Sequence, residues 1–264
     1  GRLSLNVITG GSDTDQQRDG DFLNHDQRYQ RTREYLDILK RIWTSTAPVD
    51  YHGEFYRFVG ALTDVKPLQQ PHIPVYFSGA SAAAVEVAAD YADTYMLWGE
   101  PVADFAAHTR QVRLAASARG RNPRFSVSFR PIVADTEQQA WARANEILER
   151  IRETRQRLGL PVSNHAPANA GSKRLLAAAQ RGEVLDERLW MGIAQLTGAQ
   201  WNSTALVGTP EQVAKALGKY YQQGASAFLL RGFDPLEDTI RYGNGLIPAL
   251  REHLSGMTPF TEQH

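Results

Sequence analysis

Short β-branched or aromatic runs alternate along this chain with longer amphipathic stretches, and this alternation restricts the fold more than any other feature. Each run is followed by a polar or Gly-containing turn and then by a helical segment. Such an order is typical of βα units, whose strands form a parallel sheet. The sequence therefore predicts an α/β fold, with strands over Leu3–Thr9, Val75–Ser78, Thr94–Trp98, Phe125–Val133 and Ala227–Arg231.

Helical periodicity and capping patterns separate these strands. Apolar residues recur at helical spacing from about Gln27 to Thr44, which predicts an amphipathic helix. Thr136 and Thr209 are each followed three residues later by Gln, the spacing of a capping box. Further helices are predicted over residues 82–89, 102–118, 136–151, 173–181, 189–197, 210–223 and 236–254.

The alternation breaks between Arg152 and Ser203, where no strand is evident. Long connections of this kind in compact domains are usually functional. We expect a lid over a site at the strand ends; a packed helical decoration is the alternative. Five βα units are too few to close an eight-stranded barrel, so the sequence predicts either an open sheet or a barrel whose beginning is missing.

The composition excludes several classes of function. The 29 Lys and Arg residues balance 29 Asp and Glu residues, so no electrostatic attraction to nucleic acid or an anionic membrane is expected. No cysteine occurs, which excludes thiol catalysis and fits a reducing compartment such as the cytoplasm. No apolar run is long enough to span a bilayer, and the seven histidines show no metal-ligand spacing.

Several segments together resemble the bacterial-luciferase-like flavin monooxygenases, closest to alkanesulfonate monooxygenase. The matching segments are residues 1–10, 19–29, 70–81, 97–101, 205–208 and 236–238. The resemblance implies a TIM (β/α)8 barrel in a single domain over residues 1–264, with a lid or insertion at about 152–203. The five predicted strands would be the fourth to the eighth of that barrel, and its first three strands would precede Gly1, absent from the given sequence.

The resemblance also implies an FMN site at the ends of the strands. Its cofactor-binding residues would be Asn6, Thr9, His25, Tyr29, Gly79, Ala80 and Ser81. The residues themselves allow this assignment, because His25 and Tyr29 share a helix face near an N-terminus that favours phosphate. Gly79 permits close backbone approach, and Ser81 can donate a hydrogen bond. The alternatives are ordinary surface structure for the His-Tyr pair and a plain N-cap for Ser81.

The substrate side departs from the pattern of alkanesulfonate monooxygenase. That enzyme has Arg and His two positions apart where this chain has Ser128 and Arg130, an Arg near the position of Thr197, and a Tyr at the position of Phe233. The remaining candidates are Arg130 and Arg231, whose guanidinium groups suit a sulfonate or carboxylate, and Trp98 as a pocket wall. Ion pairing of the arginines and simple packing of Trp98 are the alternatives.

The resemblance implies a two-component monooxygenase that uses O2 and FMNH2 delivered by a separate NAD(P)H:FMN reductase. Its substrate would be a small organosulfonate or related organosulfur compound, and its products would be sulfite and an aldehyde. The family also implies a homo-oligomer, either a dimer or a tetramer. Two alternatives stay open: a deazaflavin-dependent hydride-transfer oxidoreductase of the same fold, and a non-catalytic flavin-binding partner subunit.

Overall fold

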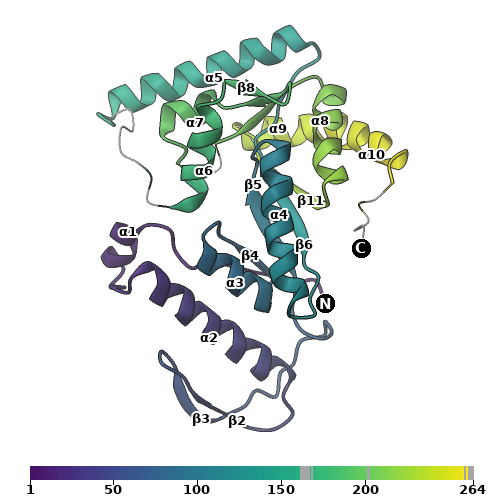
Figure 1. The fold of residues 1–264 in the computed structure, drawn as a ribbon. Coiled ribbons are helices and arrows are strands. Elements are labelled where there is room, and N and C mark those ends of the chain that lie inside the picture. Colours follow the sequence, from purple (N-terminus) through teal and green to yellow (C-terminus); the bar gives the residue numbers. More distant parts are fainter. Residues whose placement is uncertain (161–166, 168, 201–202, 259, 261–264) are drawn as a thin grey trace. The chain divides into compact units, whose positions relative to one another are not determined.

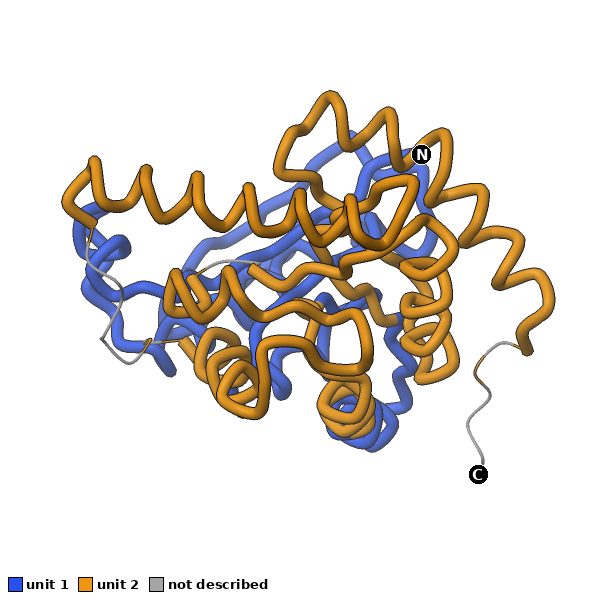
Figure 2. The backbone as a smooth tube through the Cα atoms, turned by 90° about the horizontal axis from the view of Figure 1, so that it is seen from above, with its two compact units in different colours: residues 1–96, 111–124 blue, residues 97–110, 125–264 orange. Residues whose placement is uncertain are grey.

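The computed structural model of the chain describes residues 1–160, 167, 169–200, 203–258 and 260. Helices and strands alternate along most of the chain (Figure 1). Two compact units are formed (Figure 2): unit 1 contains residues 1–96 and 111–124, and unit 2 contains residues 97–110 and 125–264. The expectation of a single domain over residues 1–264 stays a prediction.

Unit 1 is built around parallel strands. β4 (Val75–Ser78) lies between β1 (Leu5–Val7) and β5 (Thr94–Trp98), the last two residues of which belong to unit 2. The side chains of Val75 and Phe77 are fully buried, and burial of each contributes about 1.5–3 kcal/mol. The strands predicted at residues 75–78 and 94–98 are confirmed at both ends, and the first strand is shorter than predicted.

The helices of unit 1 begin where polar side chains cap them. α2 (His25–Thr44) starts two residues earlier than predicted, because Asn24 and Gln27 form a capping box. Ser81 caps α3 (Ala82–Tyr91) by accepting the Ala84 N–H at 3.2 Å. α1 (Asp13–Arg18) was not predicted. α4 (Val102–Ser117) begins in unit 2 and ends in unit 1.

A hairpin of β2 (Val49–His52) and β3 (Arg57–Ala61) follows α2 and was also not predicted. Its turn is held by a carboxylate on α2. Glu34 accepts hydrogen bonds from the N–H groups of residues 54, 55 and 56 at 2.7, 3.0 and 3.1 Å. β2 alternates over only four residues, and β3 exposes Val59, so neither strand has the longer alternation that identifies a half-buried strand.

Unit 2 contains a second parallel strand pair, β6 (Arg124–Phe129) with β11 (Ala225–Leu230); the first residue of β6 belongs to unit 1. Phe125, Val127 and Phe129 are fully buried on β6. The capping boxes at Thr136 and Thr209 are both confirmed. They start α5 (Glu137–Arg157) and α8 (Pro210–Gln222).

The segment 152–203, in which the sequence predicts no strand, contributes two short strands, β8 and β9, to a small sheet. Its strand order is β7-β10-β9-β8, with bounds Ile132–Val133, Ala205–Gly208, Leu189–Trp190 and Val184–Leu185. α6 (Ala170–Ala179) precedes it in the chain, and the helix predicted over 189–197 is wrong in its first part, because α7 (Gly192–Thr197) begins only after β9. Ile132, Trp190 and Val207 share one buried cluster with small residues of α5. Residues 161–166, 168, 201 and 202 of the predicted lid lie outside the described residues.

Proline interrupts two further predicted elements. The strand predicted over 125–133 splits between β6 and β7 at Pro131, which has no N–H for a strand ladder. The C-terminal helix consists of α9 (Pro235–Arg241), a π-helical turn at Tyr242–Leu246 and α10 (Ile247–Ser255). Pro248 cannot donate to the carbonyl four residues earlier, which accounts for the local change of helical pitch. Within the described ranges, no helix is both long and apolar enough to cross a bilayer.

Candidate functional site

The turn after β4 brings Gly79 against Tyr29 of α2. Gly79 has φ +145°, and a Cβ added to it would lie 2.7 Å from the Tyr29 Oη and 2.6 Å from the Ala84 Cβ. Tyr95 fixes the same turn by donating its hydroxyl hydrogen to the Gly79 carbonyl. Only glycine fits here, so the backbone of the turn lies directly beside the phenol.

Tyr29 is set in this position by its surroundings. The side chain is nearly buried and meets the Phe77 ring edge-on at 6.5 Å between centroids. Burial raises the pKa of the Tyr29 phenol, while a hydrogen bond with Ser81 and the charge of Arg28 lower it. The phenol therefore stays protonated near neutral pH and can donate a hydrogen bond to an oxyanion.

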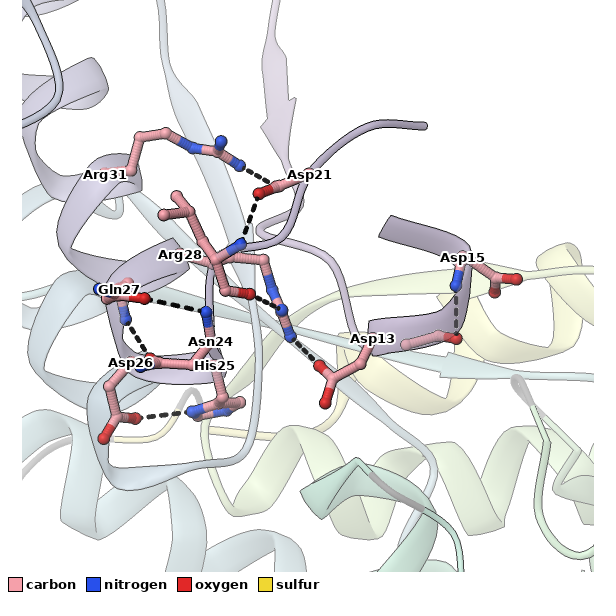
Figure 3. Close-up of polar contacts among 11 residues, drawn as sticks. Asp13, Asp15, Asp21, Asn24, His25, Asp26, Gln27, Arg28 and Arg31 are labelled. Carbon is pink, nitrogen blue, oxygen red and sulfur yellow. Dashed lines mark hydrogen bonds and ion pairs between the residues drawn. The ribbon is translucent and has the colours of Figure 1, made fainter. Parts of the chain in front are cut away.

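His25 lies one helical turn before Tyr29, at the start of α2. The two rings are 4.9 Å apart between centroids, with planes inclined at 53°, which confirms that they share a helix face. The His25 Nδ1 is 2.7 Å from the Asp26 Oδ1 (Figure 3). The structure thus brings His25, Tyr29, Gly79 and Ser81 into one cluster, with Ala80 in the turn between the last two.

Two arginines of α2 hold the loop that leads into this helix (Figure 3). Arg28 is buried, donates to the Leu23 carbonyl at 2.6 Å and pairs with Asp13 at 2.6 Å. Arg31 pairs with Asp21 at 2.5 Å and lowers the pKa of that carboxyl group. Sequence spacing does not indicate these arginines, since Asp13, at the start of α1, and Asp21, in the loop, lie 15 and 10 residues away from them.

The two candidates on and after β1 differ in their surroundings. Thr9 is buried and donates to the Thr32 hydroxyl at 3.0 Å, which in turn donates to the Arg28 carbonyl at 2.9 Å. Asn6 is exposed and lies in register with Tyr76 of β4. Thr9 therefore connects the end of β1 to α2.

The substrate-side candidates belong to unit 2. Trp98 ends β5, and its ring lies 3.1 Å from the position of a Cβ on Gly171, so the start of α6 packs against it. α6 is held by an ion pair between Arg174 and the buried Glu100, whose Nε to Oε1 distance is 2.7 Å. These contacts agree with a packed insertion; its function as a lid stays a prediction.

Arg130 and Arg231 follow the neighbouring parallel strands β6 and β11. The Arg130 Nη1 donates to the Gly232 carbonyl at 3.1 Å, and its guanidinium lies 5.2 Å from the centre of the Phe233 ring. Burial and the charge of Arg231 lower the pKa of Arg130. Arg231 is exposed, and among the described residues no carboxylate forms an ion pair with it. The ion-pair alternative is therefore not found for Arg231.

The positions that depart from alkanesulfonate monooxygenase have local partners. Ser128 is buried on β6, and its carbonyl accepts the Gly99 N–H at 2.8 Å. The Thr197 hydroxyl donates to the Ile193 carbonyl at 2.7 Å, at the end of α7. Phe233 packs under Arg130. None of these three supplies the charged or phenolic group that the alkanesulfonate enzyme has there.

Comparisons with known proteins agree with this α/β architecture. A model of the luciferase-like monooxygenase family matches residues 1–227. The chain belongs to this family, and the α/β fold of the luciferase-like TIM-barrel type is confirmed.

Solved structures with the same fold include enzymes of different chemistry. Riboflavin lyase RcaE, solved with a modified FMN, is 19% identical with a TM-score of 0.76, over 99% of this chain and 66% of that chain. EDTA monooxygenase EmoA from Chelativorans sp. BNC1 is 20% identical with a TM-score of 0.71, over 99% and 70%. An F420-dependent secondary alcohol dehydrogenase is 18% identical with a TM-score of 0.66, over 95% and 70%. The chain thus spans about two thirds of the length of these structures.

Proposed function

We propose that this chain is part of an FMNH2-dependent two-component monooxygenase that acts with O2 on a small organosulfonate or related organosulfur compound. The observation that carries the proposal is the cluster in which Tyr29, Gly79 and the N-terminus of α3 meet. Sulfite and an aldehyde are the proposed products. A separate NAD(P)H:FMN reductase would deliver the reduced flavin, and a homo-oligomer is the proposed assembly.

The residues of this cluster fit the phosphate of FMN. Gly79 has no Cβ, so its backbone lies directly against the Tyr29 hydroxyl, and this contact holds the phenol beside the turn that leads into α3. The first N–H groups of α3 lack helical partners, and the helix dipole favours an anion there. Tyr29 and Ser81 are hydrogen-bonded to each other, so the pair adds one remaining hydroxyl hydrogen as a side-chain donor.

Bound reduced flavin would supply the activation of O2, and the protein would position the reactants. In this proposal Tyr29, Ser81 and the α3 N-terminus bind the phosphate. Arg130 and Arg231 bind the anionic group of the substrate, since the charge of Arg231 acts on Arg130 and an anion relieves such repulsion. Trp98 forms a pocket wall that excludes water.

A deazaflavin-dependent hydride-transfer oxidoreductase is the second candidate. It is favoured by the likeness of the fold to the F420-dependent alcohol dehydrogenase. A phosphate-binding cluster fits either cofactor and therefore does not distinguish the two candidates. Oxygen consumption distinguishes them. The deazaflavin candidate predicts tight binding of that cofactor and no oxygen uptake.

The test measures oxygen uptake and sulfite release by the full-length protein supplied with FMNH2. The panel contains alkyl, bulky and sugar-derived sulfonates, with polycarboxylates as a second class of anion. Sulfite from any sulfonate is the expected result. FMNH2 binding without sulfite from any of them would refute desulfonation, and oxidation of a polycarboxylate instead would identify the other substrate class.

Two matched variants test the cofactor site within the same experiment. Tyr29→Phe removes the phenol of the cluster, and we expect it to weaken FMN binding about tenfold, since a hydrogen bond to a charged group is lost. Tyr35→Phe makes the same change at an exposed position of the same helix and should leave the affinity unchanged. Equal affinities of both variants would contradict the assignment of Tyr29.

A further inference from the structure

The turn after β11 is organised around one buried carboxylate, that of Asp238 on α9. The Asp238 Oδ2 accepts the N–H groups of Phe233 at 2.8 Å and Asp234 at 3.0 Å. Gly232 lies so close that a Cβ there would collide with the Asp238 side chain. The carboxylate therefore determines the path of the backbone from Gly232 to Asp234.

The other oxygen of Asp238 receives an arginine from α5. The Arg143 Nη2 donates to the Asp238 Oδ1 at 2.5 Å, and the Asp238 side chain is 1% exposed. A buried carboxylate without such partners is strongly unfavourable. Backbone donors on one oxygen and a cation on the other thus hold the group in a fixed orientation.

This turn contacts Arg130 and directly follows Arg231, the two arginines proposed to bind the substrate. Its Gly232 carbonyl accepts Arg130, and its Phe233 ring lies beneath the same guanidinium. One turn further along the helix, the Tyr242 hydroxyl donates to the Pro131 carbonyl at 2.5 Å and so fixes the residue after Arg130. One helical segment therefore fixes the turns that follow both β6 and β11.

We propose that Asp238 is a positioning residue that holds Arg130 and Arg231 in place to bind one anionic group. This inference rests on the proposed anion-binding role of the two arginines. In this proposal the Asp238 Oδ2, which accepts the N–H groups of the turn, positions the arginines. The ion pair with Arg143 keeps this carboxylate in the core. A residue that only stabilised the fold would act through burial and charge alone.

Two double variants separate these roles. Asp238→Asn with Arg143→Gln removes both charges but keeps an acceptor oxygen for the turn. Asp238→Leu with Arg143→Met also removes both charges and fills a similar volume, a replacement that buried ion pairs often tolerate, but it has no acceptor. Glu237→Gln, at the exposed neighbouring position, controls for the loss of one negative charge.

The assay is phenylglyoxal modification of Arg130 and Arg231 in the full chain, quantified by peptide mass spectrometry against increasing sodium sulfate at constant ionic strength. Sulfate should protect both arginines in the wild type and in Glu237→Gln. The half-protecting concentration should rise less than about threefold in the Asn/Gln variant and about tenfold or more in the Leu/Met variant.

Equal protection of the Leu/Met variant and the wild type would overturn the proposal, as would a wild type that sulfate does not protect. The assay needs neither flavin nor turnover. Sulfate protection that depends on Asp238 in a protein without oxygenase activity would therefore refute the proposed reaction and leave the positioning role intact.

Discussion

Replacement of Gly79 by alanine tests the cofactor cluster through its tightest contact. The residue has φ +145°, and the new Cβ would lie 2.6 Å from the Ala84 Cβ and 2.7 Å from the Tyr29 Oη. Backbone strain costs about 1–3 kcal/mol and overpacking a further 1–3 kcal/mol. Because Ala84 is fully buried, the phenol is the group that must move. We expect a loss of about 2–6 kcal/mol in the free energy of unfolding and at least tenfold weaker FMN binding.

Urea denaturation and FMN titration of the same preparations measure both effects. Gly20→Ala is the matched control, because Gly20 has φ +84° with open space around its Cβ position; it should lose about 1 kcal/mol and keep its FMN affinity. In the Gly79→Ala protein, Tyr29→Phe should restore part of the stability, since it removes one of the two close contacts. Wild-type FMN affinity in Gly79→Ala, with a stability loss no larger than that of Gly20→Ala, would refute the reasoning.

Two further predictions concern unit 2. Burial, and secondarily the charge of Arg174, lower the pKa of His108 from 6.5 to about 4. The unfolded state therefore binds the proton more tightly than the folded state. The free energy of unfolding should fall as the pH falls from 7, by about 2 kcal/mol at pH 5. Urea melts should show this slope in the wild type and a flatter one in His108→Gln, and equal slopes would contradict it. Arg231→Gln should raise the KM for an anionic substrate about tenfold or more without changing FMN affinity. Arg241→Gln, a control at an exposed position, should change neither the KM nor the FMN affinity. An unaltered KM in Arg231→Gln would refute the assignment of Arg231 to the substrate site.

Much of the fold could be predicted because its signals are local. β4 and β5 have compact apolar runs bounded by polar turns, and the capping boxes at Thr136 and Thr209 need only three residues of sequence. The strands β8 and β9 of the small sheet gave no such signal. β8 and β9 have only two residues each, and they exist because Trp190 packs into a core formed by distant segments.

The site shows the same division between local and distant information. Helical spacing placed His25 and Tyr29 on one face, which the ring contact confirms. The meeting of Tyr29 with Gly79 joins positions 50 residues apart and was expected only through the family resemblance. Arg28 and Asp238 were missed because a charged residue in a helix usually faces solvent, and their burial depends on partners that no sequence spacing indicates.

The departures from alkanesulfonate monooxygenase bear on specificity. At the position of a tyrosine this chain has Phe233, which keeps a ring face for the Arg130 guanidinium but has no hydroxyl to donate. Ser128 and Thr197 supply no cation, so the proposed anion site depends on Arg130, Arg231 and backbone groups. Strong discrimination among substrates arises when buried polar groups of a site are left unpaired by the wrong ligand. A site that relies on two guanidiniums has few such groups, and on the proposed function we therefore expect it to accept several anions of similar size.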